Sequence, residues 1–532
     1  MASEFARSGI LFRFIMRKER FRSLLWLVGV PCFTFIITFA LDDLYPTQQA
    51  RDGMAEGMRN PAMTAMVGPG DLDHYTLGAM TAHQMLLFTA IIVGLMNILL
   101  VTRHTRGDEE KGRMEIIQSL PVGRLSNLHA MLLMVCVSNL LLALVTGFGL
   151  ATLPFDGMGL EGSLLYGAVL GGIGLFFAGV AALFAQLSGS NRGARGYAIT
   201  LLVIAYLMRG IGDVTVEALS WISPLGWVTK AQVYAHNDWW PVCLMFLGSA
   251  IGFAGAYYLH SIRDLGAGFL NERPGRKQAS PLLRTPIGLA WRLQRTGTIA
   301  WGIGMLLIGL SYGSVLGELE SFFQENEMMK QFLAEAPGVS LTEQFISKII
   351  TVMAILATVP PVMAMNKLYG EEKRNRIEPV LGRAVSRTRL MTSYGLLSAG
   401  NGFVMLSLAA IGLWAAGTAA MEGKLAFGMV YSAAIAFYPA LLVMIGTSAM
   451  LIGLLPKWNA LVWLYLFYSF IVVYLGGLFQ FPEWVAQISP FGHIPQLPVE
   501  EMDVSKVWLL TAVAILLATV GWMGYKRRDL HG

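Results

Sequence analysis

Twelve long apolar stretches, separated by shorter polar segments, set the pattern of this chain. Each is close to the roughly 20 residues that a helix needs to cross a bilayer core of about 30 Å. In hydrocarbon every backbone polar group must be paired within the chain, which favours helices. The pattern predicts an all-α polytopic membrane protein with about twelve transmembrane helices, at residues 24–41, 83–101, 129–152, 163–187, 196–213, 241–262, 298–316, 346–366, 391–417, 425–454, 460–479 and 506–525.

Positive charge is distributed unequally between the two sets of connecting segments. If the N-terminus is cytoplasmic, 31 of the 39 Lys and Arg residues fall on the cytoplasmic side. Cytoplasmic loops are enriched in Lys and Arg, so this bias sets the orientation. An even number of spans puts both termini on the same side. We therefore predict a multi-pass membrane protein with both termini in the cytoplasm.

Two basic segments precede the first and seventh spans. The first 23 residues alternate Arg and Lys with Phe, Leu and Ile, which is typical of an amphipathic helix lying on the membrane surface. A short solvated helix is the alternative. The segment from Ile287 to Arg295 ends a Pro-, Gly- and Arg-rich stretch and predicts a second interfacial helix.

The chain repeats itself at a nearly constant offset. Loop residues 107–124 match 370–387 at a shift of 263, Ile222–Gly226 matches Ile488–Gly492 at 266, and Arg263-Asp-Leu matches Arg528-Asp-Leu at 265. Each half has six spans, so the halves share one orientation and form two parallel six-helix repeats. The predicted domains are a first half with its N-terminal interfacial helix (1–265), a linker with the second interfacial helix (266–297) and a second half (298–532).

The repeated loop after the second span of each half carries a Glu-x-x-x-Arg-x-Glu pattern. Charged pairs four residues apart stabilise a helix, so residues 106–119 predict one short charged helix. The pattern favours a pair of docking surfaces for a twofold-symmetric partner; a solvated connector is the alternative. The candidate docking residues are Glu109, Arg113, Glu115, Arg124, Glu372, Arg376, Glu378 and Arg387.

A second repeated motif follows the fifth span of each half. Glycines end the span, and a proline stops the next apolar stretch, which is too short to cross the membrane. Such interrupted helices are tolerated only when they pack on protein or line a cavity. We predict an outer re-entrant hairpin in each half, with an ordinary outer loop as the alternative. The motif residues are Gly210, Glu217, Ser223 and Pro224, and Gly476, Glu483, Ser489 and Pro490.

A few polar residues lie within the apolar stretches. Arg209 is the one Arg inside such a stretch. We expect its side chain to face protein or water, or to snorkel to the membrane surface, with Asp213 or Glu217 as its partner. The candidates for a substrate pathway are Asn97, Tyr206, Arg209, Tyr468 and Tyr474. Hydrogen bonds between helices and an aromatic belt are the alternatives for the Asn and Tyr residues.

Composition agrees with this picture and excludes several classes of protein. Hydrophobic residues make up 55% of the 532 and charged residues 14%, against about 25% charge in soluble domains. No P-loop for ATP, no catalytic motif and no paired-cysteine or metal-ligand spacing occurs in the sequence, and the three cysteines lie in apolar stretches. The net charge of +5 reflects the loops and indicates no nucleic-acid partner.

These features together resemble the type-2 ABC exporter permeases. The loop from Glu109 to Pro121 is similar to the coupling segment of that family, and the Ser223-Pro224 and Ser489-Pro490 corners are similar to its outer motif. Two six-span units in one chain resemble the membrane subunit of tetronasin-type polyketide-antibiotic exporters. The second loop departs from the first, with Pro379 for Ile116 and Ala384 for Pro121.

The resemblance implies a permease subunit without ATPase activity of its own. It implies two copies of a separate ABC ATPase subunit that bind ATP and Mg, membrane lipids around the spans, and a hydrophobic or amphiphilic small-molecule substrate such as an antibiotic that is moved out of a bacterial cell. Two alternatives stay open at this point: an ion-coupled secondary transporter, and a non-transporting membrane partner of a signalling ATPase.

Overall fold

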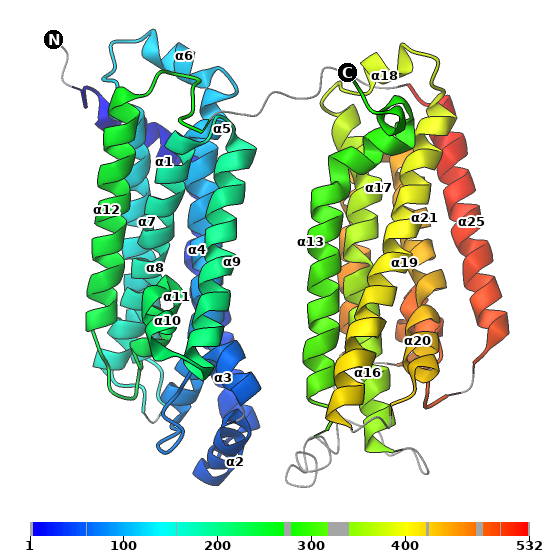
Figure 1. The fold of residues 1–532 in the computed structure, drawn as a ribbon, viewed down its shortest axis with the longest axis horizontal. Coiled ribbons are helices and arrows are strands. Elements are labelled where there is room, and N and C mark those ends of the chain that lie inside the picture. Colours follow the sequence, from blue (N-terminus) through cyan, green and yellow to red (C-terminus); the bar gives the residue numbers. More distant parts are fainter. Residues whose placement is uncertain are drawn as a thin grey trace. The chain divides into compact units, whose positions relative to one another are not determined.

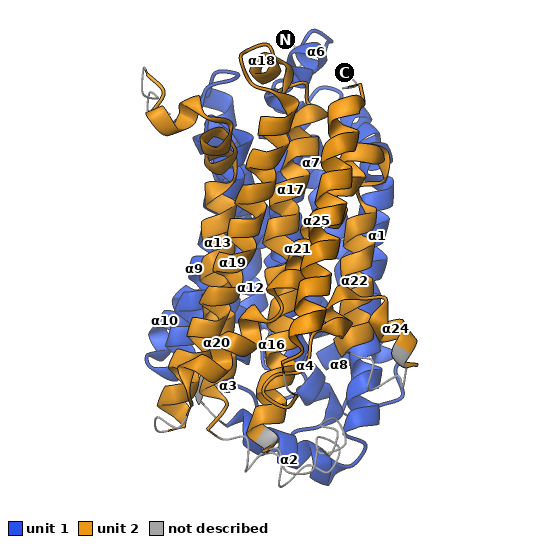
Figure 2. Cartoon of the chain, turned by 90° about the vertical axis from the view of Figure 1, so that its right-hand side faces the viewer, with its two compact units in different colours: residues 1–274 blue, residues 275–532 orange. Residues whose placement is uncertain are grey.

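The computed structural model describes residues 4–59, 61–155, 157–270, 278–317, 340–421, 425–474, 482–500 and 502–529. The chain divides into two compact units, residues 1–274 (unit 1) and 275–532 (unit 2), which Figure 2 colours separately. Each unit is a bundle of long helices (Figure 1), and the described residues form no strand beyond one isolated bridge between Ser188 and Leu270.

Twelve helices in the described part of the chain are long and apolar enough to cross a membrane, six in each unit. The predicted all-α polytopic membrane fold is confirmed. Unit 1 holds α1 (Ser8–Leu44), α4 (Leu77–His104), α7 (Ser126–Ala151), α8 (Leu160–Leu187), α9 (Asn191–Val214) and α12 (Trp240–Ile262). Unit 2 holds α13 (Pro286–Ser314), α16 with α17 (Leu341–Ala357, Val359–Glu372), α19 (Arg387–Ala420), α20 with α21 (Phe427–Ile435, Tyr438–Leu454), α22 (Leu461–Tyr474) and α25 (Val504–Arg527).

Two of the spans of unit 2 are interrupted near a proline. Pro360 and Pro361 lie in the first turn of α17, and Pro439 lies in the first turn of α21. A proline has no N–H to donate and its ring collides with the preceding turn, which favours a break at these two places, whereas α1 continues through Pro31. The two pieces of each span still form one apolar stretch of membrane-crossing length, Thr342–Glu372 and Phe427–Leu454.

The predicted interfacial helices are not separate elements in the structure. α1 is continuous over 37 residues, a length of about 55 Å, and α13 begins at Pro286 and runs without a break through the predicted interfacial segment. The exposed apolar residues Ile10, Phe14 and Phe21 lie on the first part of α1. The amphipathic pattern is therefore carried by the first turns of a long span, because no residue there stops the helix.

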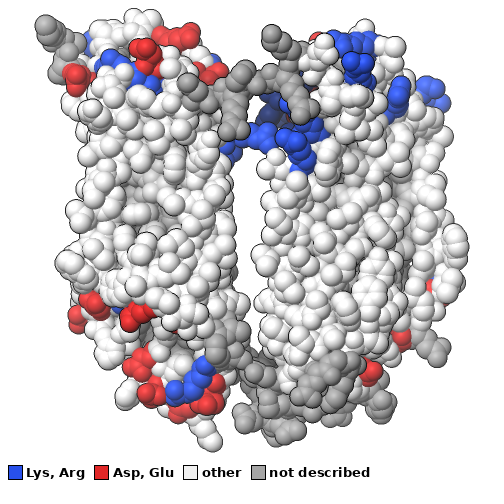
Figure 3. Space-filling view, in the orientation of Figure 1, with Lys and Arg blue, Asp and Glu red and all other residues white. Residues whose placement is uncertain are grey.

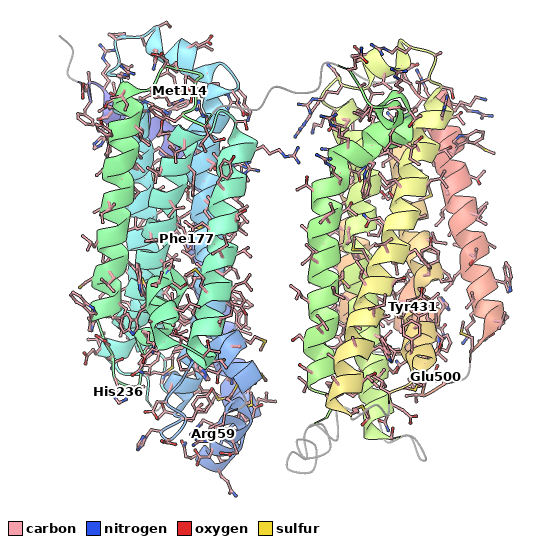
Figure 4. All side chains as sticks on the ribbon, viewed as in Figure 1. Arg59, Met114, Phe177, His236, Tyr431 and Glu500 are labelled. Carbon is pink, nitrogen blue, oxygen red and sulfur yellow. The ribbon has the colours of Figure 1, made fainter. Side chains whose placement is uncertain are left out.

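The core of unit 1 forms around α8, in which Phe177 is fully buried at the middle of the bundle (Figure 4). Glycines bring the helices close together. A Cβ placed on Gly167 of α8 would lie 2.1 Å from the carbonyl oxygen of Ala143 in α7. In unit 2, a Cβ on Gly309 of α13 would lie 2.3 Å from the carbonyl oxygen of Ala409 in α19. Small residues at such contacts are the usual means of packing helices in a membrane, where burial of apolar surface gives no drive.

On the face that Figure 3 shows, charged side chains gather toward the ends of each unit and are nearly absent between them. One end of unit 1 carries the short helices α5 (Arg106–Glu109) and α6 (Arg113–Gln118), and one end of unit 2 carries α18 (Glu378–Leu381) (Figure 1). We call this the charged-loop end of each unit. The opposite end of unit 1 carries α2 (Gln48–Met58), α3 (Pro61–Val67), α10 (Glu217–Ile222) and α11 (Pro224–Lys230).

Candidate functional site

The first charged loop contains two short helices, not the single helix predicted over 106–119. α5 ends at Glu109 and α6 begins at Arg113, with Gly112 between them at φ +67°. That left-handed conformation ends a right-handed helix and costs a glycine little. The equivalent residue of unit 2, Asn375, also has a positive φ of 55°, and Asn is among the residues that tolerate it best. The predicted pairing of Glu109 with Arg113 along one helix is therefore wrong.

Glu109 instead pairs with Arg263, 154 residues further along the chain. The Arg263 guanidinium donates to both carboxylate oxygens, at 2.9 and 3.0 Å, and the backbone N–H of Gly266 donates at 2.6 Å. Arg106 lies 3.0 Å from the same carboxylate and donates from Nε to the carbonyl of Ser188 at 2.7 Å. All three charged side chains are at least nine-tenths buried. This Glu109 cluster joins α5 to the residues that follow α12.

Unit 2 repeats the pair between this Glu and the Arg after the last helix, with Tyr369 in place of Arg106; we call it the Glu372 cluster. Arg528, which follows α25, lies 2.6 Å from Glu372 at the end of α17. Arg387 donates to the carbonyl of Arg528 at 2.6 Å, and its counterpart Arg124 donates to the carbonyl of Arg263 at 2.7 Å. The loop repeat and the Arg-Asp-Leu repeat of the sequence thus meet at one place in each unit.

A second ion pair holds the exposed part of each loop. Arg113 lies 2.6 Å from Asp108, and the equivalent Arg376 lies 3.6 Å from Glu371. Met114 and its counterpart Ile377 are both 5% exposed, so each loop also buries one apolar side chain (Figure 4 labels Met114). The loops are therefore fixed to the bundle by charge on one side and by burial on the other.

The outer surface of each loop is open. Glu115 and Glu378 are exposed, as are Ile116 (70%) and Leu120 (56%) in unit 1. We call Glu115, Ile116 and Leu120 the α6 surface. In unit 2 the matching positions, Glu378, Pro379 and Arg383, are all exposed and form the α18 surface. Of the predicted docking residues, Glu109 and Glu372 face the interior, whereas Glu115 and Glu378 face outward.

At the opposite end of unit 1, the Ser223-Pro224 corner folds back along α9. The Ser223 hydroxyl is buried and donates to the carbonyl of Ala205 at 2.6 Å. Ala205 lies nine residues before the end of α9, a depth of about 13 Å. α10 and α11 therefore return into the bundle, as a re-entrant hairpin does. Gly210 is buried and lies close to the backbone of Ala65. Glu217 is exposed and lies 2.5 Å from the Lys230 ammonium group, and this hydrogen bond lowers the pKa of Glu217.

In unit 2 the matching corner is partly described. Ser489 and Pro490 are buried, and Ser489 caps η3 (Pro490–His493). Tyr468 donates to the carbonyl of Val485, at 2.7 Å, in α24 (Glu483–Gln487), and Tyr474 stacks on Phe470. Gly476 and the side chain of Glu483 lie outside the described residues. Tyr468 thus binds the returning segment.

Arg209 and Tyr206 hold the segment 61–67 against α9. Arg209 pairs with Asp213 at 3.2 Å, and both side chains have no exposed area. Its guanidinium also donates to the carbonyls of Met66 (3.0 Å) and Thr64 (3.4 Å) and lies over the Tyr206 ring. The Tyr206 hydroxyl donates to Met66 as well, at 3.1 Å. Asp213 is therefore the partner of Arg209, and Glu217 is not.

Asn97 forms a reciprocal amide pair with Asn139 of α7. Each side-chain NH₂ donates to the other's oxygen, at 3.1 and 2.8 Å, and both residues are fully buried. Each also donates to its own helix, to Val93 and Val135. The Asn97 side chain therefore hydrogen-bonds across the interface between α4 and α7, which is the interhelical role that was the alternative to a substrate pathway.

Comparison with known proteins places this architecture in a family. A protein-family model described as "Multidrug efflux system permease Rv1217c, C-terminal domain" matches residues 11–259 and 283–526, one segment in each half. The chain is 35% identical over 529 residues, 98% of its length, to the multidrug efflux system permease protein Rv1217c of Mycobacterium tuberculosis, of which the match covers 95%. The chain belongs to the multidrug efflux system permease family.

In this permease the sequence revealed the site residues only in part. Arg263 and Arg528 were visible as a repeat but not as the partners of Glu109 and Glu372, because local spacing carries no information on contacts 154 or 156 residues apart. The loop motif and the Arg-Asp-Leu motif repeat at nearly the same offset, and this shared offset is the sequence signal that could have linked each Glu to its Arg. Glu19 and His104 are buried beside the first loop and lie 3.0 Å apart. The sequence did not indicate this pair, since Glu19 lies in a basic segment and His104 at the end of a span.

Proposed function

We propose that this multidrug efflux permease is the membrane-spanning subunit of an ABC exporter. Two copies of a separate ATPase subunit, which bind ATP and Mg, would dock on the α6 and α18 surfaces. The observation that carries the proposal is the repeated loop: exposed side chains on the outside, and the Glu109 and Glu372 clusters that tie the loop to the sixth helix of each unit. A push on α6 would thus reach α12 through buried ion pairs.

The proposed cargo is a hydrophobic or amphiphilic compound, such as an antibiotic, that leaves a bacterial cell. The full-length relative named as a multidrug efflux permease supports this class. The sequence resemblance to tetronasin-type exporters favours polyketide antibiotics within it. We further propose that the charged-loop ends lie in the cytoplasm, as do both termini, since most Lys and Arg residues are in the segments at those ends.

Docking is tested by co-purification of the full chain with candidate ATPase subunits. One variant reverses the charge of both surfaces (Glu115→Lys with Glu378→Lys). A second replaces both exposed apolar residues near α6 (Ile116→Asp with Leu120→Asp). Each variant should reduce ATPase capture by about tenfold or more, because residues at an interface centre contribute about 1–2 kcal/mol each. Glu161→Lys, an exposed acid at the start of α8 at the other end of unit 1, is the matched control.

The same preparations, reconstituted in liposomes, separate the possible functions. An exporter hydrolyses ATP faster when substrate is added and accumulates substrate on one side. Transport driven by a proton or sodium gradient without ATP would identify a secondary transporter. ATPase binding without substrate-stimulated hydrolysis would identify a signalling partner. Normal capture by both docking variants would exclude the α6 and α18 surfaces.

Sidedness is tested at two equivalent exposed positions. After replacement of the three free cysteines, Ser119→Cys and Gly382→Cys should both react with a membrane-impermeant maleimide only from the cytoplasmic side. Glu161→Cys should react only from outside and serves as the control. Labelling of the first two positions from opposite sides would contradict the parallel repeat and the docking scheme with it.

A further inference from the structure

Unit 1 contains a cavity of about 290 Å³ between α1, α4 and α7. Three charged residues, Glu19, Arg22 and Arg103, line part of it. Most of the remaining wall is apolar and includes Leu25, Trp26, Leu27, Met96, Leu99 and Leu100. The cavity therefore combines a polar part near the charged-loop end with an apolar part beside membrane-spanning turns, which is the shape of a site for an amphiphile.

The polar part of the cavity carries excess positive charge. Glu19 is 1% exposed and lies 3.1 Å from Arg22, 3.6 Å from Arg103 and 3.0 Å from His104. Two arginines and one glutamate leave a net charge of +1 on the lining. In the described part of the chain, both arginines contact Glu19 through Nη1 only, and their side chains stay 61% and 42% exposed. A guanidinium has five N–H donors, so each retains donors for an anion.

Unit 2 has a cavity of about 200 Å³ at the equivalent place, between α13 and α17. A shift of 275 residues pairs Glu19 with Gln294, Ser23 with Thr298 and Trp26 with Trp301. The tryptophan of the apolar wall is therefore kept in both units. Gly297 replaces Arg22, and the cation on the lining is Lys367, which already pairs with Glu371 at 3.1 Å. Thus the cavity is repeated, but the free arginine donors belong to unit 1.

We propose that the unit 1 cavity binds an amphiphile with an anionic headgroup such as a phosphate. Arg22 and Arg103 hold the headgroup through charge-assisted hydrogen bonds, and the apolar tail lies against Trp26 and Leu100. Glu19 keeps the two guanidinium groups beside each other. Both phospholipids of the bilayer and an exported anionic amphiphile have this chemistry. The site is independent of ATP coupling, because it needs only the packing of α1, α4 and α7.

Binding is measured on the purified full chain in nonionic detergent, by native mass spectrometry with added phosphatidylglycerol or with diacylglycerol of the same tails. Phosphatidylglycerol should bind at least tenfold more tightly than diacylglycerol. Arg22→Gln with Arg103→Gln should weaken phosphatidylglycerol binding by about tenfold or more. Arg13→Gln with Arg17→Gln removes the same charge from exposed positions of α1 outside the cavity and should leave binding unchanged.

Two further variants keep the proposal falsifiable if the arginine variant folds poorly. Leu100→Trp fills the apolar part without changing charge and should also displace the lipid, whereas Lys367→Gln in unit 2 should have no effect. Equal loss in the cavity and control variants, or equal binding of diacylglycerol, would overturn the proposal. A phospholipid retained through purification without addition identifies the bilayer as the source. Binding that requires addition identifies an exchanging or exported amphiphile.

Discussion

Replacing Glu109 by Gln is expected to lower the free energy of unfolding of unit 1 by about 3–5 kcal/mol. The carboxylate is the anion that contacts both Arg106 and Arg263, whose side chains are only 1% and 4% exposed, and the three groups together carry a net charge of +1. Without it, two buried cations face each other unpaired. Unfolding of the full chain in micelles measures the change. Glu115→Gln, an exposed change of the same kind, should stay within about 0.5 kcal/mol of the unmodified chain.

A double-mutant cycle with Arg263→Met identifies the pair. If Glu109 acts through Arg263, the double variant should be less destabilised than the sum of the two single variants, by about 0.5–3 kcal/mol. If the proposed docking is correct, the Glu109→Gln variant should still capture the ATPase subunit while losing transport, because Glu109 is buried and lies off the α6 surface. Additive effects on stability, or loss of ATPase capture, would contradict the role assigned to the Glu109 cluster.

Replacing Arg209 by Met is expected to destabilise the opposite end of unit 1 by a similar amount, about 3–5 kcal/mol. Asp213 would then be a buried carboxylate that retains only Ser220, at 2.5 Å, as a partner among its contacts in the described structure. The segment 61–67 would lose two hydrogen bonds to the guanidinium. Thermal unfolding and protease cleavage within that segment measure the two effects.

Tyr206→Phe is the matched control for Arg209. It removes one hydrogen bond to Met66 and should cost only about 0.5–1.5 kcal/mol. The comparison also decides between a structural role and a place in a substrate pathway. If Arg209→Met keeps normal stability and loses transport of one compound only, the pathway interpretation is correct and the structural one fails.

The repeat gives each unit a buried pair between a loop Glu and the Arg that follows its last helix, but the outer surfaces differ. Ile116 and Leu120 of the α6 surface are replaced by Pro379 and Arg383 on the α18 surface. A buried Arg–Glu pair holds each loop, whereas the exposed side chains offer different chemistry to a partner. If the proposed docking is correct, the two ATPase copies would bind with different affinities, and the α6 variants would remove one copy before the other.

Much of the fold followed from the sequence by local physical rules. Apolar stretches of membrane-crossing length predicted the twelve spans, because each helix satisfies its own backbone and needs no information from distant residues. The offset of the repeated motifs predicted two halves of six spans each, as the two units have. The same rules failed at residues 106–119, where pairs spaced four apart favoured one helix. Gly112, in a left-handed conformation, divides that segment in two.

The sequence by itself determined the class of the protein, the number of its spans and the existence of matching loops. Only the tertiary structure decided that Glu109 meets Arg263, that Asn97 meets Asn139, and that Arg22 and Arg103 both contact Glu19 at a largely apolar cavity. Helix formation depends on neighbours within one turn or two, which the sequence displays directly. Side-chain pairing depends on which faces of separate helices come together, and that is fixed only when the bundle packs.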